Sequence, residues 1–189
     1  MKRICVVDQK DQNIDDFITA IYEQYGYDFR DYSANNKINR VMGSLAASGL
    51  ADLVQLKEKV CADKVFFYEL LNKMTITVTD LFRNPSFYSA VRKLVFPYLR
   101  GHPSFKIWHA GCSSGEELIS MAIMLYEDGL LDSSVLYGTD INPQALRKAN
   151  AGIVATESIK KASAFYQQAG GKYSLTDYFH VNHGYGLFT

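Results

Sequence analysis

Hydrophobic residues in the first part of the chain recur at three- and four-residue spacing, the pattern of helices that bury one face. Four such stretches cover residues 14–25, 38–45, 53–60 and 67–74. Asn13 and Ser33 are placed to cap the first two stretches, and Gly26 and Gly49 are placed to end them. The pattern predicts a small all-helical domain over residues 1–74.

The last part of the chain, residues 85–189, combines helical spacing with short apolar runs of strand length. Residues 105–110 and 135–140 have the length and composition of strands, and residues 116–126 between them carry apolar residues on one helical face. A strand, a helix and a second strand in this order predict a βαβ unit with parallel strands. Residues 185–188 give a weaker indication of a third strand.

Two Asn-Pro pairs predict further helices here, because Asn is a common cap and Pro fits the first helical turn. The first pair, Asn84-Pro85, ends a linker over residues 75–84 and begins a helix that we expect to run to about Leu99. Its side chains expected to face inward are Phe87, Val91, Leu94, Val95 and Leu99. The second pair, Asn142-Pro143, begins a shorter helix, and residues 159–169 are expected to be helical as well.

The turn between the first predicted strand and its helix carries the candidate chemistry. Gly111 and Gly115 allow a ligand to approach the backbone closely, and the start of the helix offers unpaired N–H groups. Asp140 ends the second strand, where a carboxylate can hold the hydroxyls of a ribose. No Lys-Ser/Thr pair follows the turn, and Glu116 repels phosphate but attracts an ammonium or sulfonium group. These features predict a nucleoside ligand without a pyrophosphate; the alternative is an ordinary βαβ turn with a capping Glu.

Composition narrows the class of protein. The formal net charge of the 189 residues is zero, so no global field favours nucleic acid or a membrane surface. The three cysteines form no C-x-x-C motif, which suits a reducing compartment. No apolar run reaches the roughly 18 residues of a membrane span, so we expect a cytoplasmic protein without membrane insertion. His180-x-x-His183 lacks a third ligand nearby, and no metal site is expected.

Taken together, these residues resemble the chemotaxis receptor protein-glutamate O-methyltransferases, the CheR family. Residues 25–32 are similar to the N-terminal helical domain of that family, and residues 75–84, Thr-Ile-Thr-Val-Thr-Asp-Leu-Phe-Arg-Asn, to its linker motif. Residues 107–117 and 138–142 are similar to its cofactor loop and second strand. The resemblance spans nearly all of this chain but only the first two thirds of the family's usual length, because the family's later motifs have no counterpart here.

The resemblance implies an α/β fold: a small N-terminal all-helical domain followed by a partial Rossmann-like, S-adenosylmethionine-dependent methyltransferase domain. S-adenosylmethionine would lie over the glycine-rich loop, with Glu116 holding its amino acid end beside Ala110 and Asp140 holding its ribose hydroxyls. The linker residues expected to reach the cofactor and the reaction centre are Thr77, Thr79 and Arg83. Two departures stand out: Asn is usual in the family at Thr77, and its Glu-Glu-Pro-Tyr-Ser is Glu-Glu-Leu-Ile-Ser at residues 116–120.

The implied activity is methyl transfer to glutamate side chains of chemoreceptors, which forms glutamyl methyl esters and releases S-adenosylhomocysteine. Arg83 is expected to be the catalytic residue that orients a carboxylate. Lys37 and Arg40 are candidates for docking the cytoplasmic helices of a receptor, and the simpler interpretation of both is a solvated helix face. Two other functions stay open: a non-catalytic module that binds the cofactor or the receptor, and a methyltransferase of the same fold with another substrate.

Overall fold

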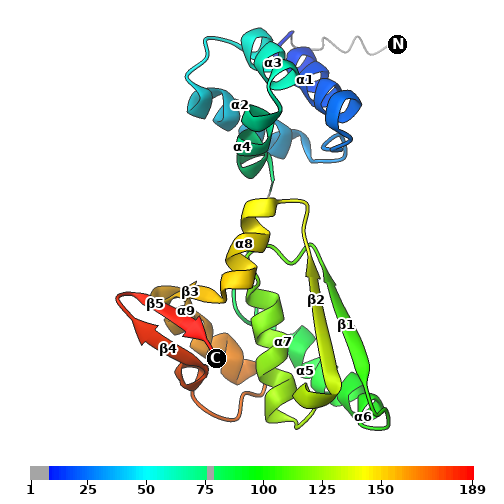
Figure 1. Cartoon of the computed structure of the whole chain (residues 1–189), viewed down its shortest axis with the longest axis vertical. Helices are drawn as coiled ribbons and strands as arrows, with labels where there is room; N and C mark the ends of the chain where they lie inside the picture. Colours follow the sequence, from blue (N-terminus) through cyan, green and yellow to red (C-terminus); the bar gives the residue numbers. More distant parts are fainter. Residues whose placement is uncertain (1–8, 76–78) are drawn as a thin grey trace, which may run out of the picture. The chain divides into compact units, whose positions relative to one another are not determined.

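The computed structural model of the chain describes residues 9–75 and 79–189. The chain divides into two compact units, Met1–Ile76 and Thr77–Thr189 (Figure 1). The described residues of the first unit form helices, whereas those of the second combine helices with two separate β-sheets. The mixed α/β class expected from the sequence is confirmed.

Residues 9–75, the described part of the first unit, form four helices around one apolar core. These helices are α1 (Gln9–Tyr25), α2 (Ala34–Ser48), α3 (Leu53–Ala62) and α4 (Lys64–Met74). Each helix contributes buried side chains to the core, among them Phe17, Val41, Leu56 and Phe67. The rings of Tyr25 and Phe67 stack with centroids 3.9 Å apart, which joins the end of α1 to α4. The four helices predicted from hydrophobic spacing are therefore confirmed.

The ends of these helices differ in detail from the prediction. α1 begins before Asn13, since no Gly or Pro precedes that residue to stop it, and Ser33 forms no side-chain cap on α2. The caps are instead Asp52 and Asp63, whose carboxylates accept the first backbone N–H groups of α3 and α4. Gly49 ends α2 with a left-handed φ of 70°, as predicted.

A continuous helical segment follows in the second unit, composed of α5 (Pro85–Ala90), the π-helical stretch η1 (Val91–Val95) and α6 (Phe96–Leu99). The predicted inward face is wrong for three residues that are largely exposed, Phe87, Leu94 and Val95. The buried face carries Tyr88, Arg92 and Phe96, spaced four residues apart. Arg92 faces inward because two carboxylates, Glu127 and Asp128, receive its guanidinium there.

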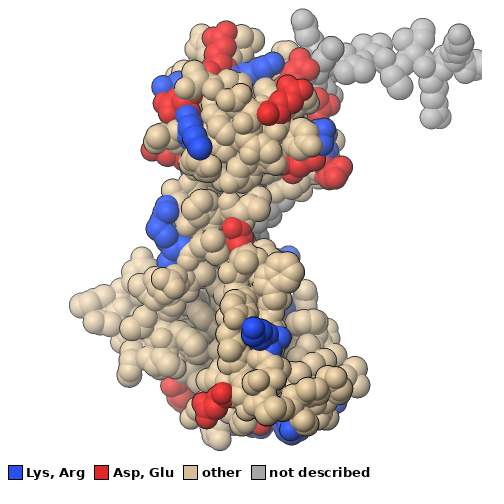
Figure 2. Space-filling model, turned by 45° about the vertical axis from the view of Figure 1, so that its right-hand side comes forward, with Lys and Arg blue, Asp and Glu red and all other residues tan. Residues whose placement is uncertain are grey.

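The predicted βαβ unit is confirmed, with β1 at Phe105–Ala110, α7 at Glu116–Glu127 and β2 at Ser134–Thr139, the last preceded by a short 3-10 turn, η2, at Leu131–Ser133. The two strands are parallel and place Ala110 opposite Thr139, so their carboxyl ends meet at one edge. Helix α7 buries most of its side chains. The opposite face of the sheet leaves Trp108 and Tyr137 exposed, and the view in Figure 2 shows few charged groups on the described part of this unit.

The chain then continues into a second, antiparallel sheet. Its elements are α8 (Pro143–Ala151), β3 (Ile153–Ala155), α9 (Thr156–Gln168), the 3-10 turn η3 (Leu175–Tyr178), β4 (Phe179–Asn182) and β5 (Tyr185–Phe188). The strand indicated near residues 185–188 therefore exists, but it pairs with β3 and β4 instead of extending the parallel sheet. His183 and Gly184 both have positive φ, the backbone of a tight hairpin turn, and this turn folds β5 back onto β4.

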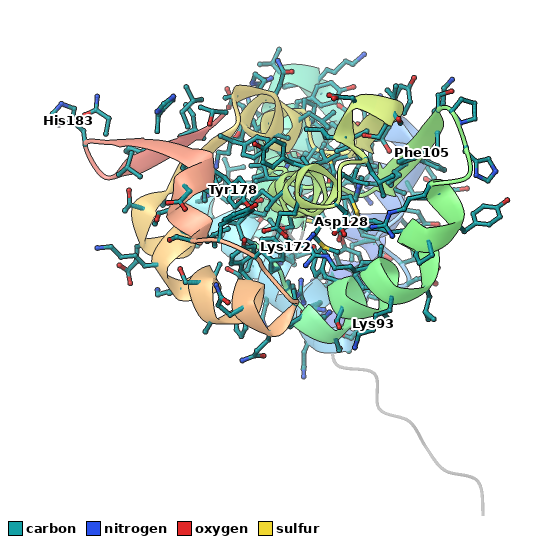
Figure 3. All side chains as sticks on the ribbon, turned by 90° about the horizontal axis from the view of Figure 1, so that it is seen from below. Lys93, Phe105, Asp128, Lys172, Tyr178 and His183 are labelled. Atoms are coloured by element: carbon teal, nitrogen blue, oxygen red, sulfur yellow. The ribbon has the colours of Figure 1, made fainter. Side chains whose placement is uncertain are left out.

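A buried cluster of charged and tyrosine side chains fastens α9 and η3 to the end of α7. The Glu127 side chain is fully buried. Its carboxylate accepts hydrogen bonds from Arg92, Tyr166, Tyr178 and the backbone N–H of Lys172. Beside it, Asp128 pairs with Arg92 and with the Lys172 ammonium (Figure 3). Burial alone would raise the pKa of Glu127, but these hydrogen bonds outweigh it and hold the pKa below its usual value.

Candidate functional site

The turn from β1 to α7 alternates between left-handed and ordinary backbone conformations. Gly111, Ser113 and Gly115 have φ values of 76°, 50° and 96°. The N–H groups of Gly111 and Cys112 both donate to the carbonyl oxygen of Thr139, at 2.7 and 2.9 Å, which ties the turn to the end of β2. A Cβ on Gly115 would lie 2.9 Å from the Ala149 Cα, so only glycine fits where the turn meets α8. The turn, residues 111–115, is thus a preformed loop at the carboxyl ends of both strands.

Asp140 braces this loop from the end of β2. Its Oδ2 accepts the Ser113 N–H at 2.8 Å, and its Oδ1 accepts the Asn142 N–H at 2.8 Å. Asn142 in turn caps α8 through its own side chain, as the Asn-Pro pair predicted. Each carboxylate oxygen of Asp140 keeps further acceptor capacity, so the half-buried group can also receive the hydroxyls of a ribose.

Glu116 borders the same loop on the other side, as the first residue of α7. The Ser114 hydroxyl lies 3.0 and 2.8 Å from the two oxygens of its carboxylate. Among the described residues neither Glu116 nor Asp140 forms an ion pair. The structure therefore brings the two predicted acids to one loop and leaves their negative charges uncompensated there.

Two residues at the loop, His109 and Cys112, have polar or ionisable side chains for which the sequence predicts no role. His109, in β1, is buried with its Nδ1 2.7 Å from Oε1 of Glu117, the second residue of α7. This pair fastens the helix start to the strand beneath it. The side chain of Cys112, within the loop, is buried, and burial raises the pKa of its thiol. Burial thus favours the thiol over the thiolate, the form that acts as a nucleophile.

The linker lies against α7 through an unusual stretch of backbone. Phe82 and Asn84, on either side of Arg83, have positive φ values of 54° and 62°. Such conformations of non-glycine residues cost about 1–3 kcal/mol and gather at functional sites. The Phe82 N–H donates to the Ser120 hydroxyl at 2.9 Å, which holds this stretch on the helix. Asn84 makes no side-chain cap on α5, contrary to the prediction.

The remaining predicted cofactor residues are placed as follows. Ala110 is exposed at the end of β1, next to the loop, and Arg83 is exposed on the linker. Thr79 is half-buried, and Thr77 lies outside the described residues. The structure therefore places Ala110, Glu116 and Asp140 at or beside the β1–α7 loop.

The predicted docking residues lie on α2 of the first unit. The ammonium of Lys37 pairs with Asp15 of α1 at 3.1 Å, so this lysine serves partly to connect two helices. Arg40 is half-buried. Docking of a receptor by these two residues stays a prediction.

Across residues 9–75 and 79–189, no three His, Cys, Asp or Glu side chains gather as metal ligands would. His183 lies at the tip of the β4–β5 hairpin, far out from the body of the unit (Figure 3). None of the described helices is long and apolar enough to span a bilayer.

Comparison with known proteins identifies the second unit. A family model, described as the CheR methyltransferase, SAM binding domain, matches residues 77–180, more than half of the chain. The chain belongs to the CheR methyltransferase family. The resemblance found in the sequence is thereby confirmed, and the cofactor of the matched domain is S-adenosylmethionine.

Relatives within the CheR family extend the match into the first unit. The chain is 42% identical over 167 residues to a putative methyltransferase, Cher3, of Pseudomonas putida, covering 88% of this chain and 61% of that relative. It is 26% identical to chemotaxis protein methyltransferases of Listeria monocytogenes and Salmonella typhimurium, covering 57% and 50% of their lengths. The chain thus spans between half and three fifths of these relatives.

The side chains around the loop fit S-adenosylmethionine. A ribose diol needs acceptors, and an amino group needs negative charge, which Asp140 and Glu116 supply. Residues 111–116 contain no Lys or Arg that would favour a phosphate ligand instead.

Proposed function

We propose that the protein uses S-adenosylmethionine to methylate glutamate side chains of chemoreceptors, forming glutamyl methyl esters. The observation that carries this proposal is the placement of Glu116 and Asp140 on the two sides of one preformed loop, where no Lys, Arg or His of the described residues pairs with either carboxylate. Membership of the CheR family supports the reaction, and the names of its chemotaxis relatives support the receptor as substrate.

In the proposed complex with S-adenosylmethionine, each of these residues contacts a different part of the ligands. Asp140 holds the ribose hydroxyls, and Glu116 holds the ammonium of the amino acid end beside Ala110. Thr77 and Thr79 contact the cofactor from the linker. Arg83 contacts the cofactor as well, orients a carboxylate near the reaction centre, either the cofactor's or the substrate's, and is the proposed catalytic residue.

The chemistry needs positioning more than acid–base catalysis. When bound, S-adenosylmethionine supplies a methyl group made electrophilic by its sulfonium. A glutamate carboxylate is already ionised at neutral pH, so no strong base is required. With the cofactor held by Glu116 and Asp140, transfer of the methyl group to a carboxylate oxygen would leave the bonding electrons on sulfur. The protein contributes by aligning the three atoms, which Arg83 and the loop can do together.

Lys37 and Arg40 are proposed to contact the cytoplasmic helices of the receptor. A second candidate function is a module that binds the cofactor or the receptor without catalysis. The chain spans 61% of the length of Cher3, so the activity of a whole relative does not by itself decide between binding and turnover. A methyltransferase of the same fold with another substrate is the third candidate.

Calorimetry with S-adenosylhomocysteine tests the cofactor site. We expect saturable binding by the wild-type chain and a loss of roughly tenfold to a hundredfold in affinity for Asp140→Ala, since hydrogen bonds to a charged group contribute about 1.5–3 kcal/mol. Asp177→Ala, which removes a surface carboxylate from η3, is the control and should bind as the wild type does. Absence of binding by the wild-type chain would refute the proposal. Binding without turnover of a receptor fragment would favour the non-catalytic module.

A further inference from the structure

Ser120 lies one turn into α7, and its side chain is completely buried. Its hydroxyl donates to the carbonyl oxygen of Glu116 at 2.6 Å and accepts the backbone N–H of Phe82 at 2.9 Å. One hydroxyl therefore joins the linker to the first turn of α7.

A helical serine that bonds the carbonyl four residues earlier is common and explains little by itself. Ser163 of α9 makes the same bond to Ile159 at 3.1 Å. The difference is the N–H of Phe82, which reaches Ser120 from 38 residues earlier in the chain. Phe82 is fully buried, so its N–H would lose its partner without this hydroxyl.

The hydrogen bond between Phe82 and Ser120 also lies in a strained stretch of backbone. Phe82 and Asn84 hold left-handed conformations that the surrounding structure has to maintain, and Arg83 lies between them. The other partner of Ser120 is the carbonyl of Glu116, the residue assigned to the cofactor's amino acid end. A single hydroxyl is thus bonded to the backbone of both segments that the proposed site needs.

We infer that Ser120 is a positioning residue, which holds the Phe82–Asn84 segment on the first turn of α7 so that Arg83 and Glu116 act on the same ligand. This inference rests on the proposed function. Ser120 is not assigned a contact with the ligand or with the reacting atoms, and its effect is transmitted through the linker backbone.

The first test needs no ligand. Hydrogen exchange followed by NMR reports the protection of the Phe82 amide in the 189-residue chain. Ser120→Ala should speed this exchange about tenfold, the equivalent of about 1.4 kcal/mol and thus of one lost hydrogen bond. Ser120→Cys, which keeps the volume but is a weaker acceptor, should act in the same direction. Ser163→Ala is the matched control and should leave the Phe82 amide unchanged. Equal protection in all four proteins would overturn the inference.

The second test separates positioning from general damage to the fold. Affinity for S-adenosylhomocysteine is measured for Ser120→Ala, Arg83→Ala and the double variant. If Ser120 acts through the linker, Ser120→Ala should weaken binding about tenfold in the wild-type background and less than about twofold when Arg83 is absent. Equal losses in both backgrounds would show an effect that does not pass through Arg83, and would overturn the inference.

Different results would overturn the proposed function and the role inferred for Ser120. A wild-type chain that does not bind S-adenosylhomocysteine overturns the proposed function and the inference that depends on it. A wild-type chain that binds, with Ser120→Ala binding equally well, overturns the inference alone.

Discussion

The two ends of α7 carry the same kind of side chain in opposite surroundings. At its start, Glu116 and the neighbouring Asp140 receive hydrogen bonds from a serine hydroxyl and from backbone N–H groups, all of them neutral donors. At its end, Glu127 and Asp128 are met by Arg92 and by the Lys172 ammonium. Neutral donors orient a carboxylate and leave its charge available, whereas cations neutralise it. The start of the helix is therefore suited to bind a positively charged ligand, and its end is suited to hold the fold together.

The largest expected effect is on stability at the end of α7. Glu127→Ala leaves Arg92 and two tyrosine hydroxyls without their shared buried acceptor, so the free energy of unfolding should fall by about 3 kcal/mol. Urea unfolding followed by circular dichroism measures this loss. Glu157→Ala, an exposed first-turn glutamate of α9, is the control and should change the free energy by less than about 0.5 kcal/mol. A loss no larger than that of the control would mean that the cluster does not hold the fold.

The next effect is on binding at the start of α7. Glu116→Gln keeps the shape of the side chain but removes its charge, so affinity for S-adenosylhomocysteine should fall about tenfold, or about 1.4 kcal/mol. Affinity for 5′-methylthioadenosine, which lacks the amino acid end, should stay the same. Glu157→Gln serves as the control. A similar loss for both ligands would place Glu116 elsewhere in the site.

A smaller effect appears as pH is lowered. The pKa of Glu127 in the folded protein is below its ordinary value of 4.5. Its stabilising contribution is therefore complete above about pH 4.5 and is lost as pH falls through the lower folded-state pKa. Glu127→Gln should flatten the acid limb of a plot of unfolding free energy against pH. An unchanged acid limb would show that other carboxylates control acid unfolding.

The smallest effect concerns the first unit. Lys37→Ala removes a surface ion pair with Asp15, so we expect the free energy of unfolding to fall by less than about 1 kcal/mol. Binding of a receptor fragment, measured by surface plasmon resonance, should fall further for Arg40→Ala than for Lys37→Ala, because Lys37 is already engaged within the unit. Unchanged receptor binding by both variants would remove this face from the proposed docking site.

The sequence is most informative where periodicity and special residues agree. The βαβ unit follows from two apolar runs that flank a helical stripe, and the loop follows from Gly111, Gly115 and the two acids. Residues 142–143 correctly mark a helix start, because the Asn side chain and the Pro ring each suit that position.

The failures have physical causes that a single sequence does not show. Arg92 lies on the buried face because its partners are Glu127 and Asp128, more than thirty residues away in sequence. Apolar spacing alone does not show such partners, so the prediction that Phe87 and Leu94 face inward is wrong. The strand near residues 185–188 was indicated, but its partners depend on a two-residue turn with positive φ. Ser120 was counted only as part of a motif, since its bond to Phe82 is visible only in three dimensions.

The proposed function requires the cofactor to lie at the loop between Glu116 and Asp140. Backbone amide shifts in NMR spectra, recorded while S-adenosylhomocysteine is added, test it most directly. We expect the amides of Ser113 and Gly115 to shift, while the amide of Lys172, bonded to Glu127 at the other end of α7, stays in place. Saturating ligand that shifts the Lys172 amide and leaves the loop amides unmoved would contradict it.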